Sequence, residues 1–418
     1  MQTAQGDSST PEPTQTPTDG PVDHSAWSQQ KTARDVEPTD KRIERDTAGV
    51  WHVYTFEEAR AVLRSGDTKQ AGFGAQFFEM FTTSKNQGIL YMEGQPHHEQ
   101  RRKTARFFTP KAVSANYRPL MERLSDKLVA GLRRKKRADL SQISFALALQ
   151  VAAQVVGLTN SRLPGMDKRL EGFFKGAGIM QPGSKPLATI RFMWRQRRVI
   201  SFFFLDVKPA INARRRKPQE DVISHLISQD YTDQEILNEC LTYAAAGMVT
   251  TREFISVAAW HFLEHPELCE RYLAAPEEDR YEMLHETLRL EPVIGHLMRR
   301  ATADVAIQSS GAPVTIPQGD FINVHIYAAN AEESVVGDHP LELCPGRAIN
   351  GDNIPSMLMS FGDGHHRCPG AYLAIQETDI LLQRLLTIPG LRIETKPTIG
   401  LMEIGQSYEL RNFILAAD

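Results

Sequence analysis

The stretch Ser360-Phe-Gly-Asp-Gly-His-His-Arg-Cys-Pro-Gly370 decides how this chain is interpreted. Its glycines at 362 and 364 permit backbone conformations that bring main-chain N–H groups close to a flat ligand or to a sulfur. Cys368 stands just before a predicted helix, whose free N–H groups and dipole favour a thiolate. Because a thiolate is a strong donor to iron, the stretch indicates an iron–thiolate site.

Other uses of Cys368 remain open from this stretch alone. His365, His366 and Cys368 could bind zinc, although no second Cys/His pair lies nearby at ligand spacing. Cys368 could be a catalytic nucleophile with a histidine base, or a buried structural cysteine, which is the commonest fate of the residue.

Composition indicates a water-soluble globular protein. The 418 residues include 41% hydrophobic and 24% charged residues, with a formal net charge of −3. No run of ~20 apolar residues occurs, so we expect no membrane span. The small net charge gives no indication of a nucleic-acid partner. Four cysteines do not form a disulfide framework, which favours a cytoplasmic location.

The pattern along the chain predicts one mainly α-helical domain with a small β region. Residues 1–47 have the composition of a disordered polar tail, and residues 48–418 are expected to form the domain. Thr55 and Glu58 have the spacing of a capping box. A long apolar helix is predicted from Glu235 to about Phe262, buried in the centre. Short β-branched segments follow Pro292 and predict strands, including all of 321–330.

Four motifs in this chain resemble those of the cytochrome P450 family. Residues 361–370 match the haem-binding signature F-G-x-G-x-[HR]-x-C-x-G at every fixed position. Glu286-Thr-Leu-Arg289 resembles the E-x-x-R pair, whose members face each other on a helix. Ala246–Thr251 resembles the oxygen-binding segment, and His97–Arg101 resembles the segment that contacts a haem propionate. All four occur in the family's order.

The resemblance implies a fold and an activity. The fold would be a cytochrome P450-like single domain that holds haem b (iron protoporphyrin IX) between central helices. The activity would insert one oxygen atom from O2 into a hydrophobic small molecule. Since this chain has no flavin or iron–sulfur motif, electrons would come from a separate ferredoxin and an NAD(P)H-dependent reductase.

The resemblance also implies roles for individual residues. Cys368 would be the axial ligand of the haem iron, within a loop that runs from Phe361 to Gly370. The expected propionate contacts are His97, Arg101, Arg299 and His366. The expected catalytic residues are Gly247, Thr250 and Thr251. The residues expected to be structural are Glu286, Arg289 and Arg347.

Val249 is a departure from the family's pattern, since it stands where an aspartate or glutamate is usual. Valine cannot carry a proton, so Thr251, Arg252, Glu253 or a water chain would deliver protons. Alternatively, the enzyme would be atypical and use peroxide or couple substrates oxidatively. A third alternative is a non-catalytic haem-thiolate protein that binds small ligands.

The substrate pocket and the partner surface are also implied by the resemblance. The pocket is expected to be apolar, with His296 as a possible polar contact. Its predicted lining residues are Phe77, Ala246, Val249, Ile294, Leu297 and Ile404. A basic face would attract an acidic electron donor. That face comprises Arg102, Lys103, Arg106, Lys111 and Arg367.

Overall fold

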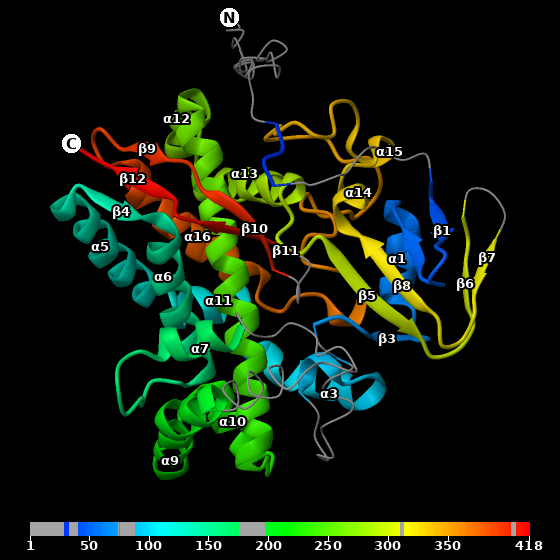
Figure 1. Cartoon of the computed structure of the whole chain (residues 1–418), viewed down its shortest axis with the longest axis horizontal. Helices are drawn as coiled ribbons and strands as arrows, with labels where there is room; N and C mark the ends of the chain where they lie inside the picture. The colour runs from blue at the N-terminus through cyan, green and yellow to red at the C-terminus, as the bar shows by residue number, and fades with distance from the viewer. Residues whose placement is uncertain are drawn as a thin grey trace, which may run out of the picture.

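The computed structural model describes residues 29–32, 41–73, 75, 88–174, 197–309, 313–402 and 407–418. Figure 1 shows helices filling one side of the molecule and the main sheet on the other. The helices are α1 Phe56–Arg64, α3 Gly94–Thr104, α4 Pro110–Asn116, α5 Arg118–Lys135, α6 Leu140–Val156, α7 Met166–Phe174, α9 Lys208–Arg216, α10 Val222–Ser228, α11 Asp233–Glu264, α12 Pro266–Ala274, α13 Glu277–Leu290, α14 Ile326–Asn330, α15 Glu333–Val336 and α16 Ala371–Leu386.

Short helical turns and strands complete the fold. The turns are η2 Ile89–Tyr91, η3 Ala105–Phe107, η4 Phe203–Val207 and η5 Gly364–His366. The strands are β1 Ile43–Arg45, β2 Trp51–Val53, β3 Thr68–Gln70, β4 Arg137–Asp139, β5 His296–Ala301, β6 Val305–Ile307, β7 Val314–Ile316, β8 Phe321–His325, β9 Arg392–Thr395, β10 Thr398–Met402, β11 Ser407–Arg411 and β12 Ile414–Ala416.

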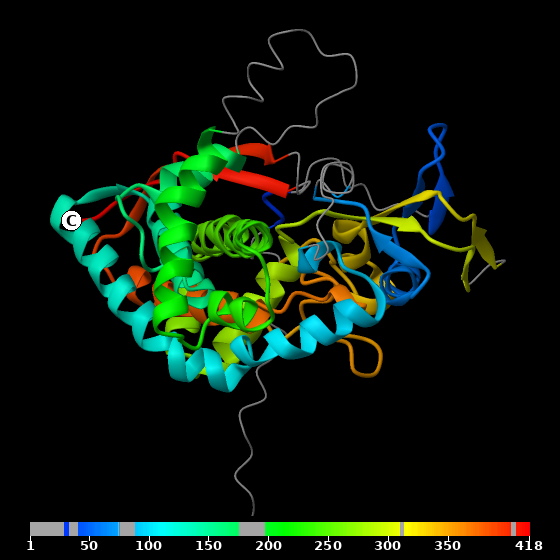
Figure 2. The same cartoon turned by 90° about the horizontal axis from the view of Figure 1, so that it is seen from below.

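Helix α11 runs through the middle of the molecule, and Figure 2 shows it end-on with helices around it. It begins at a capping box in which Thr232 and Glu235 each satisfy a backbone N–H of the other. Its main neighbour is α6, which is apolar on most faces and therefore buried. The predicted long helix, Glu235 to Phe262, is confirmed within two residues at each end.

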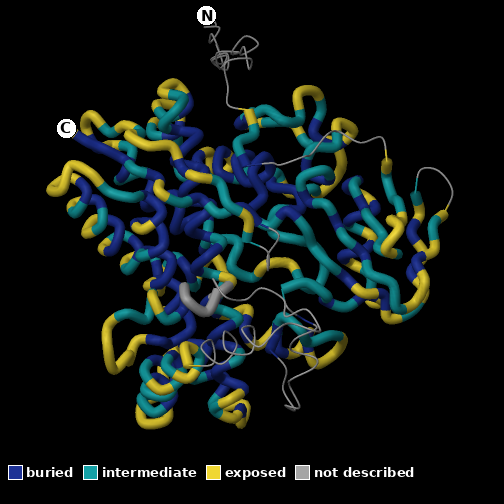
Figure 3. The backbone as a smooth tube through the Cα atoms, in the orientation of Figure 1, coloured by how far each residue is buried: buried dark blue, intermediate teal, exposed yellow. Residues whose placement is uncertain are grey.

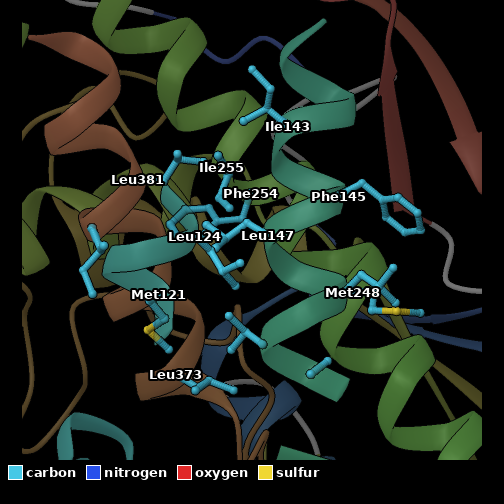
Figure 4. Close-up of a cluster of buried hydrophobic side chains, with 14 of the residues drawn as sticks. Met121, Leu124, Ile143, Phe145, Leu147, Met248, Phe254, Ile255, Leu373 and Leu381 are labelled. Carbon is cyan, nitrogen blue, oxygen red and sulfur yellow. The ribbon is translucent and has the colours of Figure 1, made fainter. Parts of the chain in front are cut away.

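The core lies where α5, α6, α11 and α16 meet, and Figure 3 shows it as a continuous buried zone. Figure 4 shows side chains from all four helices packed together, among them Met121, Leu147, Ile255 and Leu381. All four are at most 2% exposed. A core of this size stabilises the helices around it through burial of apolar area.

The main sheet has the strand order β1-β2-β8-β5-β3, with β2 and β8 parallel and the other neighbours antiparallel. One of its faces packs on α1 through a second cluster that includes Val53, Val62 and Val324. The smaller groupings are β10 with β11, β4-β12-β9, and β6 with β7. The sheet matters for function because β5 carries Arg299 toward the Cys368 loop.

Three local predictions are wrong. Ordered structure begins before residue 48, because Ile43–Arg45 pairs with β2 and residues 29–32 are hydrogen-bonded to the body of the protein. The Thr55 hydroxyl donates to the Glu58 carboxylate and does not cap the α1 backbone, so no capping box forms there. Residues 326–330 are helix α14 and do not extend strand β8.

No helix in the described part of the chain is long and apolar enough to cross a membrane.

Candidate functional site

The loop that carries Cys368 is held in one conformation by its own backbone. Gly362 N–H donates to the Met359 carbonyl at 2.7 Å, and Cys368 N–H donates to the Phe361 carbonyl at 2.9 Å. Gly364 has a φ of +66°, and a Cβ there would lie 2.2 Å from the Leu63 carbonyl oxygen. Only glycine fits this position, because any larger residue would collide with the α1 backbone. The loop therefore presents Cys368 three residues before α16.

Cys368 is the most exposed of the four cysteines, none of which is in a disulfide bond. Burial of the sulfur within the loop raises the pKa of the thiol. The Gly370 N–H and the guanidinium groups of Arg101 and Arg367 oppose this rise. Donors and positive charge around a sulfur stabilise the thiolate form, which is the form that binds metals.

Basic side chains from three elements gather beside this loop. The His97 ring on α3 stacks on the His366 ring, with centroids 4.3 Å apart and planes 23° apart. Arg101, one turn after His97, donates to the Arg367 carbonyl. Arg299 on β5 is 3% exposed and donates to the Gln70 side chain and to the Met298 carbonyl. The structure thus brings all four predicted propionate contacts to this region.

Two of these groups, Arg299 and His97, have no carboxylate in contact among the described residues. Arg299 contacts only neutral acceptors, and its burial lowers its pKa to about 10. His97 is 1% exposed, its Nδ1 has no hydrogen-bond partner in the described structure, and its burial lowers its pKa to about 3. An unpaired buried guanidinium is costly. The site therefore fits a ligand that brings its own carboxylates.

Glu93 is a member of the site that the sequence did not predict. Its carboxylate accepts from Gln70 N–H at 2.7 Å and lies 3.0 Å from His366 Nε2. Glu93, His365 and His366 could together hold a metal ion. The zinc alternative considered from the sequence used Cys368 instead of Glu93. No local motif marks Glu93, because its contacts lie more than 20 residues away along the chain.

The middle of α11 forms the other wall of the site. Ala246 is exposed although the helix around it is largely buried, and Thr250 on the same face is partly exposed. The Thr250 hydroxyl donates to the Ala246 carbonyl one turn earlier. A Cβ at Gly247 would lie 3.2 Å from the Ala152 side chain, so this position favours glycine. Thr251 is buried on another face.

Arg252 and Glu253 were predicted to deliver protons in place of the missing acid, but both are engaged in other contacts. Arg252 and Glu253 pair with each other at 2.8 Å and are both at most 4% exposed. Glu253 also accepts from Leu410 N–H and from Arg411, each at 2.8 Å. These contacts tie α11 to β11. Val249 itself is 6% exposed and apolar.

The predicted pocket residues are only partly described. Phe77 and Ile404 lie outside the described residues. Leu297 is half-buried, and its Cδ1 would contact a Cβ at Gly362 at 3.6 Å, so it lies against the Cys368 loop. Ile294 pairs with Ser407 in an isolated β-bridge. The turn after α13 therefore lies between the Cys368 loop and β11.

The expected structural residues form one buried cluster. Arg289 donates to the Glu286 carboxylate at 2.7 and 2.8 Å, and Arg347 donates to the same carboxylate at 3.0 Å. Arg289 also donates to the Asn330, Pro340 and Glu342 carbonyls. These bonds fasten the irregular segment before the Cys368 loop to α13.

Comparisons with known proteins agree with this geometry. The sequence profile of the family described as "Cytochrome P450" matches residues 281–388. The Biotin biosynthesis cytochrome P450 of Bacillus subtilis (strain 168) is 26% identical over 80% of this chain and 82% of its own length. The Erythromycin C-12 hydroxylase of Saccharopolyspora erythraea is 27% identical over 85% of each. The chain is thus similar to cytochrome P450s, both in residues 281–388 and over most of its length.

Solved cytochrome P450 structures have the same fold. A mutant of P450 EryK in complex with erythromycin B superposes with a TM-score of 0.72 at 21% identity, over 90% of this chain and 93% of that one. P450BioI in complex with an acyl carrier protein ligated to hexadec-9Z-enoic acid also gives 0.72, at 23% identity, over 90% and 94%. The predicted cytochrome P450-like, mainly α fold is confirmed.

The similarity to cytochrome P450s points to a class of enzyme and to a cofactor. The named relatives are cytochrome P450s and a hydroxylase, and the cofactor of that family is haem b. Haem b carries two propionates and an iron that can take a thiolate ligand. The thiol of Cys368 would suit the iron, and the basic groups of His97, Arg101, Arg299 and His366 would suit the propionates, so the residues present fit the cofactor.

Proposed function

We propose that this chain is a haem-thiolate monooxygenase that oxidises a hydrophobic small molecule with O2. The observation that carries the proposal is the position of Cys368 beside a basic cluster whose buried members, His97 and Arg299, contact no carboxylate among the described residues. Cys368 would ligate the iron, in the loop from Phe361 to Gly370. His97, Arg101, Arg299 and His366 would bind the propionates through charge-assisted hydrogen bonds, which are the strong kind.

The haem supplies oxygen activation, and a thiolate ligand favours O–O cleavage. The overall reaction takes O2, two electrons and two protons, places one oxygen atom in the substrate and releases the other as water. We assign proton handling to the Thr250 hydroxyl, next to the room left at Gly247. Thr251 is a less direct contributor, because it is buried on another face of α11.

The substrate would be held by the apolar wall around this site. Ala246, Val249, Ile294 and Leu297 are the described members, and Phe77 and Ile404 complete the proposed lining. Such a lining favours a hydrophobic molecule, since apolar pockets gain affinity from buried apolar area.

Electrons would come from a separate ferredoxin and its NAD(P)H-dependent reductase. The proposed docking face is basic and is exposed at every position. It comprises Arg102, Lys103, Arg106, Lys111 and Arg367. A basic face steers an acidic partner toward it and speeds association. The four cysteines, none of them in a disulfide bond, are compatible with the reducing cytoplasm, where we place the enzyme.

Isotope labelling tests the proposal. Hydrophobic compounds are first screened for a spin-state shift, and a binder is then supplied with 18O2, NADPH, a ferredoxin and its reductase. We expect one 18O atom in each product molecule and close to one product per NADPH. A product without label, formed at an undiminished rate, contradicts the proposal.

A peroxide-dependent reaction is the second candidate, and Val249 favours it. With valine at this position and Glu253 held by β11, α11 presents no free carboxylate beside Thr250 in the described structure. Hydrogen peroxide would supply both oxygen and electrons. The rate of turnover with peroxide alone, compared with the rate with O2 and NADPH, distinguishes the two candidates. A faster rate with peroxide alone supports the peroxide-dependent reaction.

A further inference from the structure

Residues 29–32, far from the site in sequence, cap the C-terminus of α13. We call this segment the strap. Figure 1 shows it as a short dark-blue segment beside α13. Gln30 Nε2 donates to the Leu290 carbonyl at 2.6 Å, and Gln30 N–H donates to the Leu341 carbonyl at 3.2 Å. Leu290 is the last residue of α13, and its carbonyl has no partner within the helix.

The strap also supplies most of the donors to a buried carboxylate. Glu291 follows α13 and is 0% exposed. It accepts from Lys31 N–H at 2.5 Å, from Thr32 N–H at 3.1 Å and from the Thr32 hydroxyl. His261 Nε2, 2.9 Å away, is the contact from the body of the protein. Burial of a carboxylate is costly without such donors. The donors of the strap therefore stabilise the buried carboxylate of Glu291.

Lys31 connects the strap to the end of α11. Its ammonium group pairs with Glu264 at 2.5 Å and lies 5.2 Å from the centre of the Trp260 ring. Both partners are in the last two turns of α11. The strap therefore links the C-terminal ends of two helices, α11 and α13. The middle of α11 and the turn after α13 form the two walls of the proposed active site.

Glu291 leads directly into the turn that faces the proposed pocket. Its carbonyl accepts from the Tyr408 hydroxyl at 3.2 Å, and Ile294 pairs with Ser407 three residues later. The turn continues through Leu297 to Arg299 on β5. A shift of Glu291 would therefore move the turn against both β11 and the Cys368 loop.

We propose that the strap is a positioning element that sets the shape of the substrate pocket by holding Glu291. Its ion pair and most of its hydrogen bonds from Gln30, Lys31 and Thr32 go to α11, to the end of α13 with Glu291, and to Leu341. We therefore assign it an effect on pocket shape and not on iron ligation. The inference rests on the proposed function, because that function assigns the turn from Val293 to Leu297 to the pocket.

The test compares two azoles in strap variants of the full-length holoprotein. Imidazole binds iron alone, whereas 4-phenylimidazole also fills the space beside it. Thr32→Val removes the hydroxyl donor to Glu291 at nearly constant volume, Thr32→Ser restores it, and a deletion of residues 1–32 removes the strap. Lys396→Ala is the control, because Lys396 pairs with the other oxygen of Glu264 from an exposed position outside the strap.

For Thr32→Val and the deletion we expect the Kd of 4-phenylimidazole to rise about fivefold or more, the ratio that one lost hydrogen bond corresponds to. The Kd of imidazole should stay within about twofold. Thr32→Ser and Lys396→Ala should bind both azoles like the wild type. In hydrogen exchange, the amides from Val293 to Leu297 should exchange faster in both strap variants, with or without haem.

The inference is overturned if the deletion variant behaves like the wild type in both measurements. These are the exchange rates of the amides from Val293 to Leu297 and the ratio of the two Kd values. An equal loss of affinity for both azoles also overturns the inference, since this would mean general damage to the haem site. Failure of the haem binding that the proposed function requires looks different, because the wild-type chain would then bind neither azole. Exchange measured on the haem-free chain still tests the strap in that case.

Discussion

At the scale of single residues, the site is defined by buried basic groups that lack an acidic partner. Arg299 and His97 are buried beside Cys368, and neither contacts a carboxylate in the described structure. Most buried charges in proteins are paired, because desolvation of a lone charge is costly. In the proposed enzyme the haem propionates would offset this cost. The same residues would then destabilise the haem-free chain.

Arg299→Met should separate the contribution of Arg299 to haem binding from its effect on the stability of the haem-free chain. We expect the variant to release haem at least about tenfold faster, since truncation of one partner of a buried charge pair is strongly unfavourable. The haem-free variant should unfold at the same temperature as the wild type or higher, because the unpaired guanidinium is gone. Haem transfer to apomyoglobin and thermal unfolding measure the two quantities.

Arg300→Met is the control for Arg299, because Arg300 is the exposed neighbour on the same strand. It should leave both quantities unchanged. Wild-type haem release from Arg299→Met would contradict the assigned role.

Glu377 on α16 should make stability depend on pH. It is 2% exposed, its Oε1 has no partner in the described structure, and burial raises its pKa from 4.5 to about 8. Between these values the folded chain keeps a proton that the unfolded chain has lost. Stability contributed by this group therefore falls as the pH rises from about 4.5 to about 8, and is level above.

Glu377→Gln removes this titration. Relative to the wild type, the variant should gain stability between pH 5 and pH 8, by a few kcal/mol at most. Urea unfolding at several pH values measures the gain. Glu278→Gln serves as the control, because Glu278 is exposed. A difference in stability between Glu377→Gln and the wild type that does not change with pH would falsify the account of Glu377.

At the scale of elements, α13 and the irregular segment after α15 are joined through Glu286. Arg289 and Arg347 both donate to its carboxylate, and Arg347 also donates to four carbonyls, those of Val336, Asp338, His339 and Glu342. A guanidinium has the donors and the planar geometry for this, and an ammonium group does not. The cluster fixes the segment that leads into the Cys368 loop.

Arg347→Lys should therefore lower the free energy of unfolding by about 3 kcal/mol, the scale for one broken partner in a buried pair. Chemical denaturation measures the change. Arg384→Lys is the control, because Arg384 pairs with an exposed aspartate, Asp126. A loss no larger for Arg347→Lys than for Arg384→Lys would show that the cluster does not fasten this segment.

The elements show what sequence can and cannot predict. The long helix and the loop around Cys368 were predictable, because periodicity and a glycine-rich motif are local patterns. Residues 29–32 were missed because a polar tail gives no sign that its donors match a carboxylate some 260 residues away. Glu93 was missed because its partners, Gln70 and His366, also lie far from it along the chain. Ile326–Asn330 was misjudged because its β-branched start resembles the strand before it, and tertiary packing decided the outcome.

At the scale of the whole molecule, one half is helical core and the other carries the main sheet, with the candidate site between α11, α3 and β5. Helix α3 contributes His97 and Arg101 to the site and exposes Arg102, and Arg106 is exposed on the turn η3 that follows. The same segment would thus serve the proposed cofactor on one side and the proposed electron donor on the other.

Arg102→Gln and Arg106→Gln should each slow reduction by an acidic ferredoxin several-fold at low salt, and the rate should depend less on ionic strength. Stopped-flow reduction over a range of salt concentrations measures both effects. Arg392→Gln on β9, distant from α3 in Figure 1, should leave them unchanged. Equal salt dependence in all three variants would rule out the basic face as the docking site.

The central claim is that the thiolate of Cys368 binds haem iron, and the absorption spectrum of the reduced, CO-bound protein tests it most directly. We predict the red-shifted Soret band of a thiolate-ligated haem for the wild type and for Cys344→Ser. Cys368→Ser should lack the band even when haem is bound. A wild-type protein that binds haem without this band, or a Cys368→Ser variant that keeps it, would contradict the claim.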